Sequence, residues 1–191
     1  MAKTGIIMKE HPILFSTEMV KAILAGNKTQ TRRIVKAEIP VNITKIIESD
    51  IDKQFHELWK GGVSEYLIKC PYGQPGDLLW VRETWAQVKG SDKIHFKADF
   101  KNPQNYKGWK PSIHLKKEAA RIWLQIEEIN VERLRDIKSH DAMCEGMIEN
   151  GEPFVPRFYD LWIKINGQQS FDLNPWVWVI KFKVISKTGK P

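Results

Sequence analysis

The run from Trp176 to Ile185 constrains the fold of this chain most, because nearly all of its residues are aromatic or β-branched. Such residues favour the extended backbone of a β-strand. Lys181 and Lys183 alternate with apolar residues near its end, so we expect these two side chains to point outward from the strand. The run therefore predicts a long strand late in the chain.

Other strands are predicted by similar runs or by alternating residues, at 13–15, 78–85, 94–98 and 121–129. Short helices are expected between them. Ser16 is a predicted N-cap of a helix that Gly26 ends, Ser139 is the predicted cap of a second helix, and the apolar spacing over 154–165 predicts a third, which Gly167 ends. Strands interleaved with short helices favour an α+β domain, with a small barrel as one arrangement.

The size and charge of the chain limit its class. Its 191 residues suit one domain with sizeable insertions, and 42% hydrophobic residues are enough for a core. The net charge of +7 favours phosphate-bearing partners. Cys70 and Cys144 form no pair with metal-ligand spacing, so we predict neither a metal nor a cofactor.

No apolar run approaches the roughly 20 residues that cross a bilayer, so no membrane partner is expected. Charged and polar residues interrupt the start of the chain, which argues against a signal segment. These interruptions are Lys3, Lys9, Glu10 and His11. The expected location is therefore the cytoplasm, and the sequence makes no prediction of the oligomeric state.

A basic segment follows the first predicted helix. Between Lys21 and Lys36 the chain has five basic residues and no acidic one. We expect Lys28–Arg33 to form a loop, in which Lys28 offers an amine and Thr31 a hydroxyl beside two arginines. The alternative is an ordinary solvated basic loop without chemistry.

Four segments resemble the motifs of ASCH domains, which belong to the PUA-like superfamily. They are Ile23–Arg33, the turn Pro75-Gly76-Asp77, the acidic segment Asp141–Gly146 and the closing run Trp178–Phe182. The longer architecture resembles ASCH proteins of phages and prophages. The resemblance implies one domain over 1–191, with a PUA-like small β-barrel, flanking short helices, and insertions at about 37–68, 87–112 and 149–173.

One branch of small bacterial ASCH proteins hydrolyses N4-acetylcytidine to cytidine and acetate, using a lysine, a threonine and a glutamate. The resemblance places these catalytic roles on Lys28, Thr31 and Glu145, and an arginine of that motif on Arg33. It implies an amidohydrolase that removes the acyl group of an N4-acylated cytosine nucleoside or base, without a cofactor. Either Thr31 itself or an activated water would attack the acyl carbon.

The chemistry depends on how these side chains meet. A threonine hydroxyl needs a base, and Lys28 could serve if burial or the neighbouring Arg32 and Arg33 lower its pKa. Glu145 could orient the lysine or pass a proton to the leaving amine. On a flat strand Lys28 and Thr31 would point to opposite faces, so we expect the chain after Gly26 to turn.

Further substrate-binding candidates come from two other segments. Arg82 and Glu83 alternate on a predicted strand, so at most one of them should face a pocket. The extended segment from Trp109 supplies the remaining candidates, for which a plain surface position is the alternative. These candidates are Trp109, Lys110, Ser112 and His114.

Basic and aromatic residues are interleaved over residues 93–121, the composition that single-stranded nucleic acid binding requires. RNA or single-stranded DNA is therefore a predicted partner. This leaves two hypotheses: the amidohydrolase, and a non-catalytic PUA-like module that binds RNA or DNA. The two are compatible if the substrate base lies in a polynucleotide and is flipped into the pocket.

Overall fold

The structure is a computed structural model that describes residues 8–40, 42–50, 55–88, 90–147, 151 and 153–191. The predicted absence of a signal segment depends in part on residues 1–7, which lie outside these ranges. No helix among the described residues is long and apolar enough to cross a membrane.

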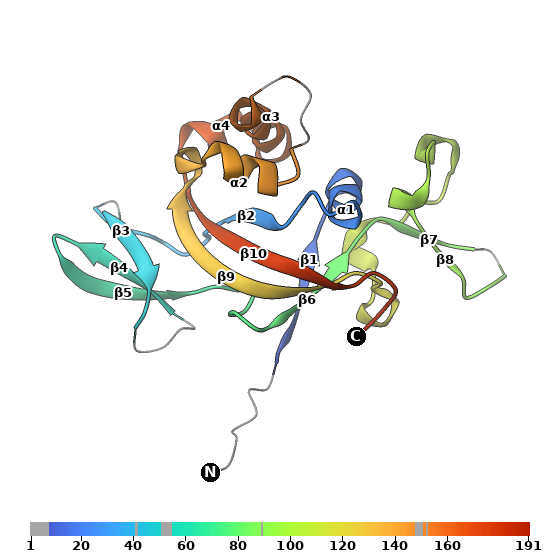
Figure 1. The fold of residues 1–191 in the computed structure, drawn as a ribbon, viewed down its shortest axis with the longest axis horizontal. Coiled ribbons are helices and arrows are strands. Elements are labelled where there is room, and N and C mark those ends of the chain that lie inside the picture. Colours follow the sequence, from blue (N-terminus) through green and yellow to red (C-terminus); the bar gives the residue numbers. More distant parts are fainter. Residues whose placement is uncertain (1–7, 41, 51–54, 89, 148–150, 152) are drawn as a thin grey trace, which may run out of the picture.

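A five-stranded sheet forms the centre of the molecule, with the order β1-β6-β9-β10-β2. Its strands are β1 (Glu10–Leu14), β2 (Gln30–Ile34), β6 (Leu78–Arg82), β9 (Trp123–Arg133) and β10 (Trp176–Ser186). Only β1 and β6 pair in parallel. The two longest strands, β9 and β10, curve together across the molecule in Figure 1. Since β1 and β2 do not pair among the described residues, the sheet is open rather than a closed barrel.

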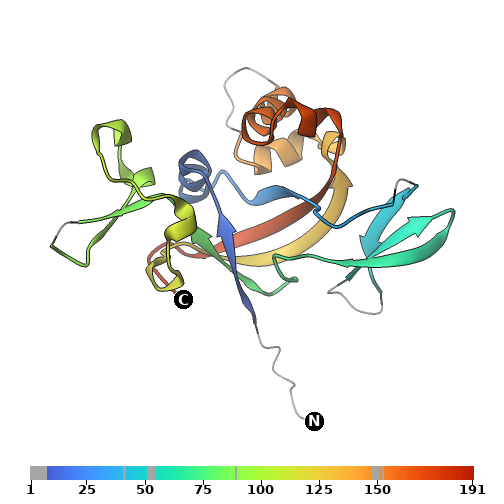
Figure 2. The same cartoon turned by 180° about the vertical axis from the view of Figure 1, so that it is seen from behind.

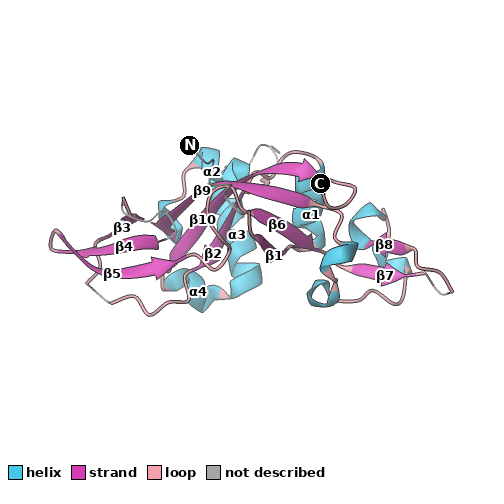
Figure 3. Ribbon diagram, turned by 90° about the horizontal axis from the view of Figure 1, so that it is seen from below, coloured by secondary structure: helices cyan, strands magenta, loops and turns pink. Residues whose placement is uncertain are grey.

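Two smaller sheets extend from opposite ends of the central one (Figure 3). At one end lie β3 (Lys45–Glu48), β4 (Phe55–Lys60) and β5 (Val63–Lys69); at the other lie β7 (Trp85–Gln87) and β8 (Ile94–Phe96). The first occupies most of the predicted insertion at 37–68, where the sequence shows no clear period. The expected single strand 78–85 is wrong, because the chain leaves the sheet after Arg82 and β7 pairs with β8 instead.

The described part of the chain has four α-helices beside the sheets, and the mixed α+β class is confirmed. They are α1 (Thr17–Leu24), α2 (Ser139–Cys144), α3 (Phe154–Asn166) and α4 (Gln168–Asp172). The predicted caps are confirmed at Ser16, whose Oγ accepts from the Met19 amide at 3.3 Å, and at Gly167, which follows α3 with φ 85°. Ser139 is not a cap but the first helical residue, and the preceding Lys138 makes no side-chain capping bond.

Helices α2, α3 and α4 gather on one side of the central sheet, seen from both directions in Figures 1 and 2. This arrangement buries both faces of β10. Val177 and Val179 pack with Phe158 and Trp162 of α3, whereas Trp178 and its same-face neighbours join the main core between the sheets. A strand covered on both faces must be apolar throughout its buried length, as this one is.

Candidate active site

The Lys28–Glu145 contact joins two distant parts of the chain. Lys28 lies just before β2 and Glu145 just after α2, and the two residues form an isolated antiparallel β-bridge. Gly146 permits this approach, because a Cβ there would lie 3.0 Å from the Cβ of Ala22 and 3.3 Å from that of Lys28. Its φ of 96° also lies in the region that glycine tolerates best.

The side chains of the bridge form a buried ion pair. Lys28 Nζ donates to Glu145 Oε2 at 2.7 Å and to the Glu145 carbonyl oxygen at 2.9 Å. Arg32 Nη1 donates to the other carboxylate oxygen, Oε1, at 3.2 Å. Lys28 is 1% exposed and Glu145 5%, so this pair is shielded from solvent. Glu145 therefore fixes the position of the lysine amine.

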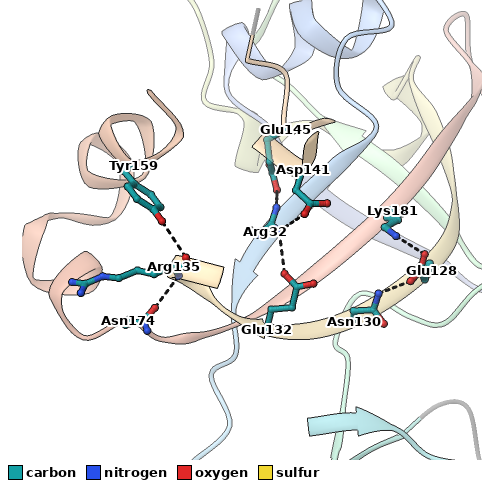
Figure 4. A network of polar contacts seen from close by, with 10 residues as sticks. All are labelled: Arg32, Glu128, Asn130, Glu132, Arg135, Asp141, Glu145, Tyr159, Asn174 and Lys181. Atoms are coloured by element: carbon teal, nitrogen blue, oxygen red, sulfur yellow. Dashed lines mark hydrogen bonds and ion pairs between the residues drawn. The ribbon is translucent and has the colours of Figure 1, made fainter. Parts of the chain in front are cut away.

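Arg32 connects this pair to the end of β9. Its Nη2 donates to Glu132 at 3.1 Å and lies 4.0 Å from an oxygen of Asp141, as Figure 4 shows. The guanidinium also lies 5.7 Å from the centre of the Phe158 ring. Because Arg32 joins Glu145 to Glu132 and Asp141, it holds the carboxylate oxygen of Glu145 that Lys28 does not contact.

Burial lowers the pKa of Lys28 below its ordinary value, and the nearby Arg33 and Arg32 act in the same direction. The attraction of Glu145 opposes this effect without cancelling it. A lowered pKa increases the fraction of neutral amine near neutral pH, and only the neutral amine can accept a proton. The electrostatics thus suit a base at this position, for the reason expected from the sequence.

A pocket of about 190 Å³ lies beside the ion pair. Thr31 and Glu145 belong to its wall, with residues of α1, β2 and α3. The full lining is Met19, Thr31, Arg32, Arg33, Ile34, Lys36, Tyr72, Glu145, Phe158, Leu161, Trp162, Ile165 and Asn166. Because β2 is the edge strand of the sheet, residues from both of its faces reach this one pocket.

Thr31 contributes a hydroxyl without a hydrogen-bond partner to this pocket. Its side chain is 1% exposed, and Oγ1 is buried without a hydrogen-bond partner in the structure. A buried hydroxyl without a partner costs free energy, which a ligand that bonds to it would recover. Lys28 Nζ donates to Glu145 rather than to Thr31. A proton transfer between them therefore requires the short approach that substrate binding often produces.

Lys28–Arg33 is not the predicted loop, because Gln30–Ile34 is strand β2, paired with β10. Thr31 and Glu145, the ion-pair partner of Lys28, nevertheless line the same pocket. Phe15 lies beneath both the lysine and Arg33: Lys28 Nζ is 5.9 Å and Arg33 Cζ is 5.1 Å from its ring centre. The expected turn at Gly26 is present, since the amides of Asn27 and Lys28 both donate to the Ala22 carbonyl, and the bridge to Glu145 then holds Lys28 just outside the strand.

Arg82 and Glu83 lie outside the lining of this pocket. The Glu83 carboxylate accepts two hydrogen bonds from Arg121, at 2.9 and 3.0 Å, and is 1% exposed. Burial raises its pKa, and Arg121 opposes that rise. The Arg82 guanidinium packs 5.4 Å from the Trp80 ring centre. A role for either residue in substrate binding stays a prediction.

The candidates between Trp109 and His114 also lie away from the pocket lining. Trp109 packs against Phe100 and Tyr106, and its Nε1 donates to the Pro103 carbonyl at 2.7 Å. The Lys110 amine lies over the Trp85 ring, and His114 is exposed on the surface beside the half-buried Ser112. These residues shape the segment next to β7 and β8, and their part in binding stays a prediction.

The wall that α3 contributes to the pocket could not be predicted from the sequence. Phe158, Leu161 and Trp162 carry the expected helical spacing, which indicates an apolar face but not what that face covers. The contacts of Glu132 and Asp141 with Arg32 could not be predicted either, because carboxylates on separate elements show no spacing signal. Lys36 belongs to the basic segment that follows α1, and this position is the sequence signal that could have indicated its place at the pocket.

No group of His, Cys, Asp or Glu side chains in the described ranges has the arrangement of a metal site. No family model matches the chain, and no curated protein matches it. A crystal structure of protein EF3133 from Enterococcus faecalis V583, described with the family name DUF984, is similar over 97% of this chain and 86% of that chain, with 8% identity and a TM-score of 0.43. A likeness this weak carries no argument about fold or function.

Proposed function

We propose that this chain is an amidohydrolase that removes the acyl group from N4-acylated cytosine nucleosides. The observation that carries the proposal is the buried Lys28–Glu145 pair at 2.7 Å beside the unpartnered hydroxyl of Thr31. A simple anion-binding loop would not need a carboxylate behind its lysine. The ASCH-like motifs supply the substrate class, and the proposal includes a PUA-like fold, with which the curvature of β9 and β10 is compatible.

The proposed reaction uses groups that lie at this site. Neutral Lys28 takes the proton of the Thr31 hydroxyl as Oγ1 bonds to the acyl carbon. The bond from that carbon to N4 then breaks, and the protonated lysine gives its proton to the departing amine of cytosine. Water hydrolyses the acyl-threonine and releases the carboxylic acid. In the alternative, Lys28 activates a water that attacks directly, and Thr31 donates a hydrogen bond to the acyl oxygen.

The walls of the pocket support a planar, apolar ligand with polar edges. Phe158 and Trp162 supply aromatic surface, while Thr31 and Glu145 supply polar groups at the floor. Such a combination, a mostly apolar lining with few fixed polar groups, is typical of small-molecule sites. A cytosine ring meets that description.

Purified protein incubated with N4-acetylcytidine is expected to release cytidine, because the site supplies both a base and a hydroxyl. Chromatography measures the conversion. Thr31→Val is the matched variant, since it removes the hydroxyl and keeps the shape of the side chain. Mass spectrometry of the rapidly quenched enzyme separates the two routes: an added acetyl group on the wild type alone indicates attack by Thr31. No conversion at high enzyme concentration would contradict the proposed function.

A second candidate function, binding of single-stranded nucleic acid, is favoured by the segment around β7 and β8. This basic arm, residues 93–121, contains several exposed lysines close to the half-buried aromatic cluster of Phe100, Tyr106 and Trp109. Lysines in such an arrangement attract phosphates along a strand. The arm could bring a polynucleotide to the pocket or act without any chemistry.

Replacing Lys107, Lys110 and Lys116 together with glutamine is expected to weaken binding of a single-stranded oligonucleotide. If each lysine neutralises one phosphate, the slope of log affinity against log salt should become smaller by about 2. Fluorescence anisotropy at several salt concentrations measures this slope. The control triple variant replaces Lys45, Lys60 and Lys183 with glutamine. These lysines are exposed elsewhere on the surface, and their replacement changes the net charge by the same amount. Equal slopes for the two variants would rule out the arm.

A further inference from the structure

The pocket has a buried floor and an exposed mouth. Thr31, Arg32 and Glu145 at the floor are each at most 5% exposed. Lys36 and Asn166 also belong to the lining, and both are exposed. A ligand that fills the pocket therefore leaves part of itself beside these two side chains.

Two of the four cations at this site lack a carboxylate partner. Lys28 and Arg32 are paired with Glu145, and Arg32 also with Glu132. The Arg33 guanidinium donates to two main-chain carbonyls, Leu14 O at 2.7 Å and Arg32 O at 3.4 Å, and the side chains of Tyr72 and Glu145 also attract it. Lys36 makes no hydrogen bond or ion pair with any described residue. The pocket wall thus has two cations, Arg33 and Lys36, that form no ion pair with a carboxylate among the described residues.

The charge at Arg33 has an energetic consequence. Burial lowers the pKa of Arg33 although Tyr72 and Glu145 act in the opposite direction, so its environment penalises the charged form. An anionic group within the pocket would offset this penalty, because opposite charges attract more strongly where water is excluded. The Lys36 side chain is exposed, so an anion that contacts its ammonium group also remains partly solvated.

The size of the pocket decides where the anionic group lies. A volume of about 190 Å³ is smaller than the roughly 300–1,000 Å³ of pockets that enclose drug-sized ligands. A base-sized ring fits the floor, whereas a sugar must remain at the mouth. Asn166 donates through Nδ2 to the Trp162 carbonyl at 3.3 Å, so its Oδ1 is oriented by the helix and can accept from a sugar hydroxyl.

We infer that the ligand is a phosphorylated cytosine nucleotide, whose sugar phosphate binds Lys36 at the mouth while the base occupies the floor. The identity of the base rests on the proposed function. The presence of a phosphate is argued from Arg33 and Lys36, which form no ion pair, and from the size of the pocket. The same phosphate chemistry occurs in a free mononucleotide and within a nucleic acid strand, and both are sources that one experiment can compare.

Calorimetric titration of the full chain with cytidine and with the 5′- and 3′-monophosphates of cytidine tests this inference without any turnover. At least one monophosphate is expected to bind about tenfold more tightly than cytidine, the value of one charge-assisted hydrogen bond. Lys36→Gln should remove this preference, so that this variant binds cytidine and the monophosphates with similar affinity. Lys164→Gln is the matched control, since Lys164 is exposed on the same helix as Asn166 but does not line the pocket.

Equal affinity of the wild type for cytidine and both monophosphates would overturn the inference, and so would a preference that survives Lys36→Gln. A cytidine dinucleotide separates the two sources. Binding as tight as that of a monophosphate assigns the site to a strand, and weaker binding assigns it to a free nucleotide.

The two proposals fail in different ways. Phosphate-dependent binding without hydrolysis of any N4-acetylated form would contradict the amidohydrolase and keep the nucleotide site. Hydrolysis of N4-acetylcytidine without a preference for phosphate would do the reverse. No binding of cytidine or either monophosphate, together with no hydrolysis of N4-acetylcytidine, would contradict both.

Discussion

Replacing Lys28 with methionine is expected to slow N4-acetylcytidine hydrolysis by about 10²–10⁴-fold, the range that a positioned general base contributes. Methionine fills the buried space of the lysine stem and removes only the amine that Glu145 orients. Turnover rates measured at saturating substrate test the expectation. Lys21→Met is the control, because Lys21 pairs with Glu18 on the surface of α1, with side chains 40% and 80% exposed.

The pH profile adds a second test of the same residue. If neutral Lys28 is the base, the wild-type rate should rise with pH and level off below the ordinary lysine pKa, because burial lowers the pKa of this amine. The residual activity of Lys28→Met should lack that rise. A variant that retains the wild-type rate and the wild-type pH profile would remove Lys28 from the mechanism.

Replacing Glu145 with alanine is expected to destabilise the fold by about 3–5 kcal/mol, the usual cost of breaking a buried ion pair from one side. The substitution leaves the Lys28 amine without its carboxylate, with one main-chain carbonyl as its remaining partner. Arg32 loses one of its two close carboxylates and keeps Glu132. Urea unfolding measured by circular dichroism gives the change in the free energy of unfolding.

Glu128→Ala is the matched control for this measurement. Glu128 also pairs with a lysine at 2.7 Å, but the side chains of Glu128 and Lys181 are 48% and 42% exposed. Such surface pairs contribute about 1 kcal/mol or less. Similar losses of stability in the two variants would show that the buried Lys28–Glu145 pair stabilises the fold no more than a surface pair does.

Much of the secondary structure was predictable because local signals decide it. The apolar period of α3 and the side-chain cap of α1 act within a few residues, and both were correctly predicted. The sheet at β3–β5 was not, since its strands are short and one of them, β5, exposes most of its side chains. The loop predicted at Lys28–Arg33 was wrong because its pairing with β10 depends on residues far along the chain.

The candidate site shows the same division. Motif positions brought Lys28, Thr31 and Glu145 to attention, and the ion pair joins two of them. The spacing of residues in the sequence does not show that Phe158 and Trp162 line the pocket. It also does not show that Arg32 contacts the second carboxylate oxygen of Glu145. Such contacts arise from tertiary packing, which brings together residues without any regular separation in sequence.

The pairing of β2 with β10 also determines when this site can exist during synthesis. The Thr29 carbonyl accepts from the Phe182 amide at 2.9 Å, and Thr31 lies opposite Ile180. A ribosome must therefore release the last strand before the threonine and the lysine beside it acquire their final neighbours. Until then β2 lacks its pairing with β10, and the pocket that Glu145 lines is incomplete. A nascent chain should thus gain ligand binding late and in one step, because contacts between distant residues form after local ones.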